Sequence, residues 1–293
     1  MTALTIRPSR EEFHALAAQH TVVPVWAELL ADLETPVATF LKLVGDGEGF
    51  LLESVEHGER WARHSFVGHD PVATLELRDG IITVRGERLT PSFPTDQGML
   101  AALDALLAAY RAPIIPDLPP LQGGIMGFLG YDVVREVEHL PNVPNDDRRL
   151  PDAVMSIIGS LAAFDHWRQR MYLIESVPVL DMQGADVDRE YDAAVARIDA
   201  TAAKLGRPLA MPLVEPPVVG EAPPEVRSTM ADGMYQRAVE VAKEHILAGD
   251  IFQVVLAQRY DIDLQADPFD FYRVLRQVNP SPYMYFLRHE GVT

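Results

Sequence analysis

Cysteine is absent from this chain of 293 residues. Without a thiol the protein has no disulfide, no thiolate nucleophile and no cysteine ligand for zinc, and this is compatible with a reducing or an oxidising compartment. Long apolar runs are also missing, since nowhere do about 18 apolar residues follow one another. The N-terminus carries Arg7, Arg10, Glu11 and Glu12 and lacks the apolar core of a signal peptide. We therefore expect a cytoplasmic protein with no membrane partner.

Basic residues are scarce. Lys and Arg number 25 against 43 Asp and Glu, which gives a formal net charge of −18. Such a charge repels phosphate backbones and anionic membrane surfaces at long range, so nucleic acid is not an expected partner. The same excess of acidic residues keeps many proteins dispersed, so it excludes partners without naming one.

Hydrophobic residues make up 48% of the chain. A large core and about two domains are expected from this length.

Capping residues mark two helix starts. Ser9 and Glu12 form a Ser-x-x-Glu capping box, in which each side chain satisfies a free backbone N–H. Thr35 offers an N-cap and Pro36 suits the first helical position, which predicts a helix to residue 43. Apolar residues at helical spacing predict further helices at 98–110, 131–137, 187–205, 233–248 and 268–278.

Strands are predicted at 22–29, 50–55, 75–77, 81–84, 123–129, 153–164, 170–176, 251–260 and 283–288. Asp79 and Gly80 tolerate positive φ and predict a tight hairpin between 75–77 and 81–84. The segments 153–164 and 170–176 are expected to form an antiparallel pair. Together these elements predict an α+β fold with mixed, mostly antiparallel sheets and flanking helices.

Six prolines lie between Gly206 and Pro224. Proline cannot continue a helix or a central strand ladder, so this stretch is predicted to be a linker. We expect an N-terminal domain at 1–205, a linker at 206–230 and the start of a second domain at 231–293.

Two glycine clusters are candidates for phosphate binding, at 45–49 and at 123–130, but neither has the Gly-x-Gly-x-x-Gly order. The first is interpreted as a turn and the second as a strand pressed against another backbone. No His-Glu-x-x-His or comparable ligand set occurs among the nine histidines, so no metal ligand is predicted. Gln253 and Gln258 lie among apolar residues, and their amides need internal partners or a polar cavity. The sequence leaves both readings open.

Taken together, these segments resemble component I, the large subunit, of the anthranilate synthase family among the chorismate-utilising enzymes. Two long runs, 249–259 and 279–284, carry most of the resemblance. Supporting positions are Thr35, Pro36, Val37, residues 50–56, Arg63, residues 65–68, Gly123, Gly124, Gly127, Tyr131, Asp132, Tyr272 and Arg273. His64 departs from the family, which has tyrosine at this position, and the change is expected to affect packing.

The resemblance implies the conversion of chorismate and ammonia to anthranilate and pyruvate, the first step committed to tryptophan. Magnesium would hold the substrate carboxylates, and a glutamine amidotransferase subunit, component II, would supply ammonia. The family's catalytic histidine and magnesium-binding glutamates correspond to positions beyond residue 293. The resemblance therefore maps no catalytic residue and no metal ligand onto this chain. We expect a C-terminally truncated component I that is inactive alone.

Gln253 is the substrate-side candidate. In relatives that use water to make isochorismate, a lysine at the corresponding position activates water as a base. Glutamine cannot take up a proton at neutral pH, so an incoming ammonia nucleophile fits better than water.

The resemblance also implies feedback inhibition by L-tryptophan. The family's inhibitor site corresponds to Glu53, Ser54, Pro282, Tyr283 and Met284. A hydroxyl, a carboxylate and backbone groups suit the amino-acid ends, while Met and Pro can pack against the indole. Two alternatives remain. One is aminodeoxychorismate synthase component I, which 254–255 and 282–284 disfavour, and the other is a non-catalytic fragment that binds tryptophan or the amidotransferase.

Overall fold

The computed structural model describes residues 4–54, 63–86, 91–209, 213–218, 220 and 224–293. The chain divides into two compact units, Met1–Pro212 with Leu275–Thr293, and Leu213–Val274. The domain limits predicted from the sequence stay predictions, and part of the proline-rich linker lies outside the described residues. Among those that are described, no helix is long and apolar enough to cross a bilayer.

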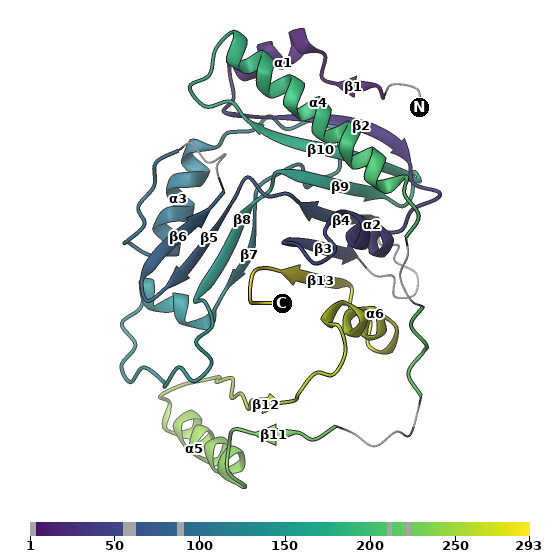
Figure 1. The fold of residues 1–293 in the computed structure, drawn as a ribbon. Helices are drawn as coiled ribbons and strands as arrows, with labels where there is room; N and C mark the ends of the chain where they lie inside the picture. The colour runs from purple at the N-terminus through teal and green to yellow at the C-terminus, as the bar shows by residue number, and fades with distance from the viewer. Residues whose placement is uncertain (1–3, 55–62, 87–90, 210–212, 219, 221–223) are drawn as a thin grey trace. The chain divides into compact units, whose positions relative to one another are not determined.

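The first unit contains a seven-stranded antiparallel sheet (Figure 1). Its strands, in spatial order, are β1 (Ile6–Arg7), β2 (Val22–Leu30), β10 (Arg170–Pro178), β9 (Ser160–Asp165), β4 (His64–His69), β3 (Gly49–Ser54) and β13 (Tyr283–Arg288). Three helices cover one face of this sheet, α1 (Arg10–Ala17), α2 (Pro36–Leu43) and α4 (Ala185–Leu205). The strand β13 therefore joins a sheet otherwise built from the first 178 residues.

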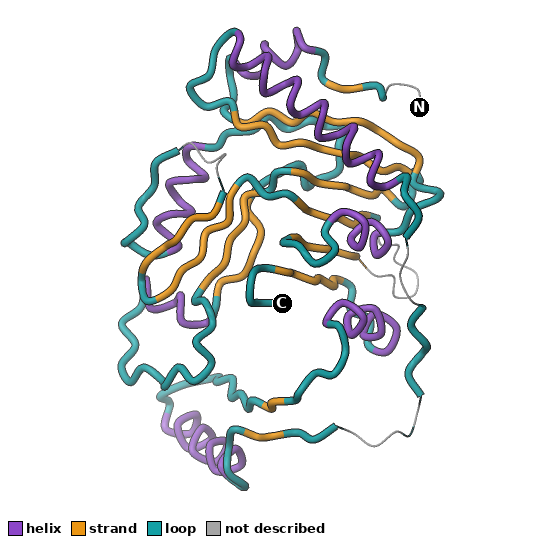
Figure 2. The backbone as a smooth tube through the Cα atoms, viewed as in Figure 1, coloured by secondary structure: helices purple, strands orange, loops and turns teal. Residues whose placement is uncertain are grey.

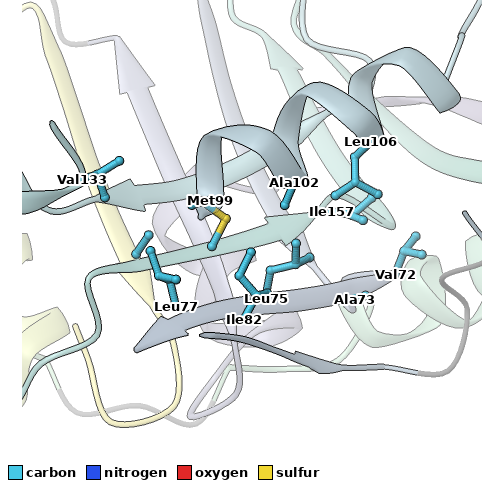
Figure 3. Packing of buried hydrophobic residues seen from close by; sticks show 11 residues of the cluster. Val72, Ala73, Leu75, Leu77, Ile82, Met99, Ala102, Leu106, Val133 and Ile157 are labelled. Atoms are coloured by element: carbon cyan, nitrogen blue, oxygen red, sulfur yellow. The ribbon is translucent and has the colours of Figure 1, made fainter. Parts of the chain in front are cut away.

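A second, four-stranded antiparallel sheet lies in the same unit. Its strands are β6 (Ile81–Arg85), β5 (Ala73–Arg78), β8 (Ala153–Ile157) and β7 (Ile125–Leu129). The helix α3 (Met99–Ala109) packs Met99, Ala102 and Leu106 onto it (Figure 3). The short 3₁₀ helix η1 (Tyr131–Glu136) ends at Glu136, whose carboxylate accepts hydrogen bonds of 2.7 and 2.8 Å from the first two backbone N–H groups of α3.

The second unit has little regular structure (Figure 2). It holds β11 (Arg227–Ser228) paired with β12 (Tyr260–Asp261), the helix α5 (Met234–Ala248) and most of α6 (Pro268–Val278). Gly249 ends α5 with a φ of 81°. The last turn of α6, from Leu275 onward, belongs to the first unit.

Several local predictions are confirmed. The capping box of Ser9 and Glu12 starts α1, and the Thr35 side chain caps α2 at Pro36. Asp79 and Gly80 take φ values of 50° and 77° in the turn between β5 and β6. The α+β fold with mostly antiparallel sheets is also confirmed.

The predicted close approach of the glycine strand is confirmed at Gly127. A Cβ there would lie 1.9 Å from the carbonyl oxygen of Val154 on the neighbouring strand. Only hydrogen at the Cα of Gly127 fits this spacing.

Three predicted elements differ from the structure. The segment 153–164 is two strands, because the chain leaves the four-stranded sheet at Ile158 and enters the seven-stranded sheet at Ser160. Only the second of them, β9, pairs with β10. The predicted helix at 131–137 is a 3₁₀ helix.

The predicted strand at 251–260 is wrong except at its last residue. Its apolar composition favoured a buried strand, yet Phe252 is 93% and Val255 82% exposed. A strand needs a neighbour for its backbone N–H and C=O groups. Within the described residues, only Tyr260 and Asp261 of this region pair with one. For the predicted strand at 50–55, Val55 lies outside the described residues.

Candidate functional site

The predicted inhibitor residues meet at the pairing of β3 with β13. In this antiparallel register Ser54 lies opposite Tyr283, and Glu53 lies opposite Met284. Pro282 is exposed and directly precedes β13. The structure thus brings the two segments together within one unit.

The strand pair places these residues on two faces of the sheet, since opposite residues in an antiparallel pair share a face. Leu51 and Phe286 are opposite each other and buried, and the Phe286 ring packs edge-on against Phe40 of α2 at 5.4 Å between centroids. Side chains alternate along a strand. Glu53 and Met284 therefore lie on the helix-covered face.

Ser54 and Tyr283 lie on the opposite face, together with Tyr285. This face is open along β13, where Tyr283 is 83% and Tyr285 68% exposed. A ligand therefore has access to two aromatic rings on the face that also carries the half-buried Ser54. Glu53, with a side chain only 4% exposed, lies behind them.

An ion pair fixes Glu53. Arg276, in the last turn of α6, donates a hydrogen bond of 2.8 Å from Nη2 to Glu53 Oε1, and its Nε lies 2.8 Å from Oε2. A buried carboxylate needs such a partner, because an unpaired charge in a low-dielectric interior is costly. The pair fastens the end of α6 to β3. Sequence reasoning missed Arg276, since nothing in its local pattern indicates a partner 223 residues away.

Polar groups continue along the covered face onto β4. Ser65 lies opposite Glu53 in the register, and its Oγ is 2.8 Å from Nε2 of His166. Burial lowers the pKa of His166, although the neighbouring Asp165 carboxylate opposes this effect. His64, the position that departs from the family, stacks on Phe66 at 6.1 Å between ring centroids.

Asp165 anchors the turn after β9. Its carboxylate accepts hydrogen bonds from Arg63 at 2.8 and 3.2 Å and from the backbone N–H groups of Trp167 and Arg168. Burial raises the pKa of Asp165, but the Arg63 guanidinium and the Arg168 N–H outweigh burial and hold it below its ordinary value. Asp165 therefore stays ionised and paired at neutral pH.

Three histidines with lowered pKa values predict how stability depends on pH. Burial lowers the pKa values of His64, His166 and His289 in the folded chain. A histidine with a lowered folded pKa contributes stability that is present above its unfolded pKa, near 6.5, and is lost as pH falls toward the folded value. We expect the melting temperature to fall between about pH 7.5 and about pH 5.5.

Thermal melts at about 0.5 M salt, which screens the net charge, measure this slope. His166→Gln keeps a hydrogen-bonding group beside Ser65 and should make the slope shallower. A melting temperature that rises on acidification across this interval would contradict the expectation.

Gln253, the substrate-side candidate, is exposed in the second unit. Gln258 donates a hydrogen bond of 2.9 Å to Ser228 Oγ, so its amide has an internal partner. Where the structure describes the chain, no group of three or more His, Asp or Glu side chains is placed to hold a metal ion. The described residues therefore offer no magnesium site.

We compared the chain with known protein families and with curated proteins. Residues 50–293 match the family described as chorismate binding enzyme. Anthranilate synthase component 1 of Mycobacterium bovis is 41% identical over 291 residues, which cover 97% of this chain and 55% of that protein. The protein of the same name from Mycolicibacterium smegmatis is 40% identical, over 97% of this chain and 54% of its own length.

A solved structure of a protein with the same name has a similar fold. The crystal structure of anthranilate synthase component I from Streptococcus pneumoniae TIGR4 aligns with a TM-score of 0.59 and 25% identity, over 86% of this chain and 53% of that chain. The chain thus spans about 55% of the length of the M. bovis relative that it matches.

Proposed function

The chain belongs to the chorismate binding enzyme family, and on this premise we propose that its residues serve in the large subunit of an anthranilate synthase. The reaction is the conversion of chorismate and ammonia to anthranilate and pyruvate in the cytoplasm. A glutamine amidotransferase subunit supplies the ammonia, and magnesium is the expected cofactor. The relatives' names and the family match over 50–293 support this reaction.

In the proposed reaction, Gln253 disfavours water as the attacking nucleophile. An amide cannot act as a base at neutral pH, so it does not activate water as a lysine would. Gln253 is exposed, so a substrate can reach its side chain. Its proposed role is to favour ammonia over water as the nucleophile.

The β3–β13 pair is proposed to bind L-tryptophan as a feedback inhibitor. The register that sets Ser54 against Tyr283 and Glu53 against Met284 is the observation that carries this proposal. On the open face, the Ser54 hydroxyl can hydrogen-bond to an amino-acid end, and Pro282 and Tyr283 can pack against the indole. On the covered face, Glu53 and Met284 hold the strands in place, with Arg276 fixing Glu53.

Calorimetric titration of the chain with L-tryptophan tests the site. We expect Ser54→Ala to weaken binding about tenfold, because a hydrogen bond to a charged group contributes about 1.5 kcal/mol. Tyr283→Ala should weaken binding at least as much, since a stacked ring contributes area as well as contact geometry.

Tyr260→Ala is the matched control, because Tyr260 is also an exposed tyrosine, 57% exposed, but lies on β12. It should bind like the parent chain. If Ser54→Ala and Tyr283→Ala are both folded and both bind tryptophan with unchanged affinity, the proposal that tryptophan binds here is wrong. An equal loss in all three variants would point to a general effect on folding.

A further inference from the structure

A cavity lies in the first unit, and none of its lining residues belongs to β3 or β13. Its volume is about 330 Å³. It is lined by residues from β2, β10, α3 and β8, by the start of β7 and by the proline-rich loop 112–124. Leu106 of α3 and Ile157 of β8 form part of its wall and also belong to the core cluster of Figure 3. One part of the cavity wall is thus packed core, and another part is loop.

The wall of the cavity is apolar and uncharged. Among the described residues that line it, aliphatic side chains and prolines predominate and none is ionisable except Tyr110. Two lining residues, Leu107 and Ile114, are 62% and 88% exposed, so they lie where the cavity opens to solvent. An apolar molecule gains by covering such a wall, because apolar surface is then removed from water. A charged ligand would lose its hydration there without gaining a partner.

Three lining residues have polar side chains, Tyr110, Gln122 and Ser176, and the last two differ in the hydrogen-bonding capacity that they leave for a ligand. Gln122 accepts a hydrogen bond from Ile115 N at 3.1 Å and donates one to Ile115 O at 2.8 Å, so its amide closes the loop. Ser176 donates a long hydrogen bond of 3.3 Å to Gln122 O. A hydroxyl oxygen that donates can still accept, so Ser176 offers an acceptor for one ligand N–H or O–H.

We propose that this cavity binds a small, uncharged, mainly apolar ring compound with a single hydrogen-bond donor, which meets Ser176 Oγ. The volume is at the lower end of small-molecule sites, which suits one or two fused rings. The absence of a charged side chain on the described wall selects against chorismate, anthranilate and zwitterionic amino acids. The site is separate from the proposed tryptophan site, which has the Glu53–Arg276 pair at its back.

Methyl NMR of the chain labelled at isoleucine Cδ1, titrated with indole, tests the proposal. Ile125, Ile157 and Ile158 are three of the isoleucines that line the cavity, and their methyl signals should shift. The methyl group of Ile198, buried in α4, should not. Anthranilate and L-tryptophan at the same concentration should leave the three cavity methyls unchanged.

Three variants sharpen the test. Ala112 is exposed and lines the cavity, so Ala112→Phe should fold and abolish the indole shifts by filling the space. Ala108, exposed on α3 and outside the wall, gives the matched control Ala108→Phe, which should bind like the parent chain. Ser176→Ala should bind indole about fivefold more weakly, the effect of one neutral hydrogen bond.

The proposal is overturned if indole leaves the cavity methyls unshifted, or if Ala112→Phe binds as well as the parent chain. It is also overturned if anthranilate shifts the same methyls as strongly as indole. Tyr283→Ala should leave indole binding intact, so failure here and failure of the tryptophan site are separately visible.

Discussion

Gly127→Ala is expected to destabilise the first unit strongly. The added Cβ would lie 1.9 Å from the Val154 carbonyl oxygen and within 3 Å of two further backbone atoms of β8. Because the obstacle is backbone and not the end of a flexible side chain, β7 and β8 must move apart and lose their pairing. We expect a cost of about 3 kcal/mol or more, at the upper end of overpacking effects.

Urea denaturation followed by circular dichroism measures this loss. Gly206→Ala is the control, since a Cβ there meets only ordinary contacts at 3.7 and 3.8 Å and the backbone φ is −68°. It should be neutral or slightly stabilising, because alanine restricts the unfolded chain. Equal midpoints for Gly127→Ala and the parent chain would show that β7 and β8 are not packed as described.

Arg276→Met is expected to destabilise the first unit by about 3 kcal/mol. The change removes the guanidinium that pairs with Glu53, whose side chain is 4% exposed, and so breaks a buried ion pair. Breaking a buried pair by removing one partner is more costly than replacing both. The double variant Glu53→Gln with Arg276→Met should therefore recover part of the loss.

The control is an exposed pair. Arg227 and Asp263 are 50% and 70% exposed, so Arg227→Met should cost less than about 1 kcal/mol. Denaturant midpoints of the three variants and the parent chain give the comparison. If Arg276→Met and Arg227→Met cost the same, or if the double variant is less stable than Arg276→Met, the ion pair does not fasten α6 to β3.

Short-range chemistry explains the elements that the sequence predicted well. Ser9, Thr35 and the Asp79–Gly80 turn act within four residues, so their patterns are readable without the fold. Gly127 was readable for a related reason, because a glycine inside an apolar strand indicates close backbone approach.

Long-range partners explain what the sequence did not show. The break between β8 and β9 depends on which sheet each half joins, and an apolar run does not specify this. Residues 251–259 have strand composition without a strand neighbour among the described residues. Glu136 caps α3 across 37 residues, and Arg276 pairs with Glu53 across 223.

The candidate site also combines features that the sequence indicates with features that depend on long-range pairing. The family resemblance named Glu53, Ser54 and Pro282–Met284, and the structure sets their strands side by side. The alternation of β3 and β13, once their register is known, separates the exposed Ser54–Tyr283 face from the buried Glu53–Met284 face. No sequence pattern gives that register, because the two strands are far apart in the chain.

Hydrogen exchange of the chain with and without saturating L-tryptophan tests the central claim most directly, that β3 and β13 together form one tryptophan-binding surface. Exchange should slow about tenfold or more in peptides covering both Gly49–Ser54 and Tyr283–Arg288, as ligand binding stabilises the paired strands. Peptides from Ile81–Arg85, the edge of the other sheet, should be unchanged, and D-tryptophan should have a smaller effect. Protection confined to other segments, with both β3 and β13 unaffected by L-tryptophan, would contradict the account.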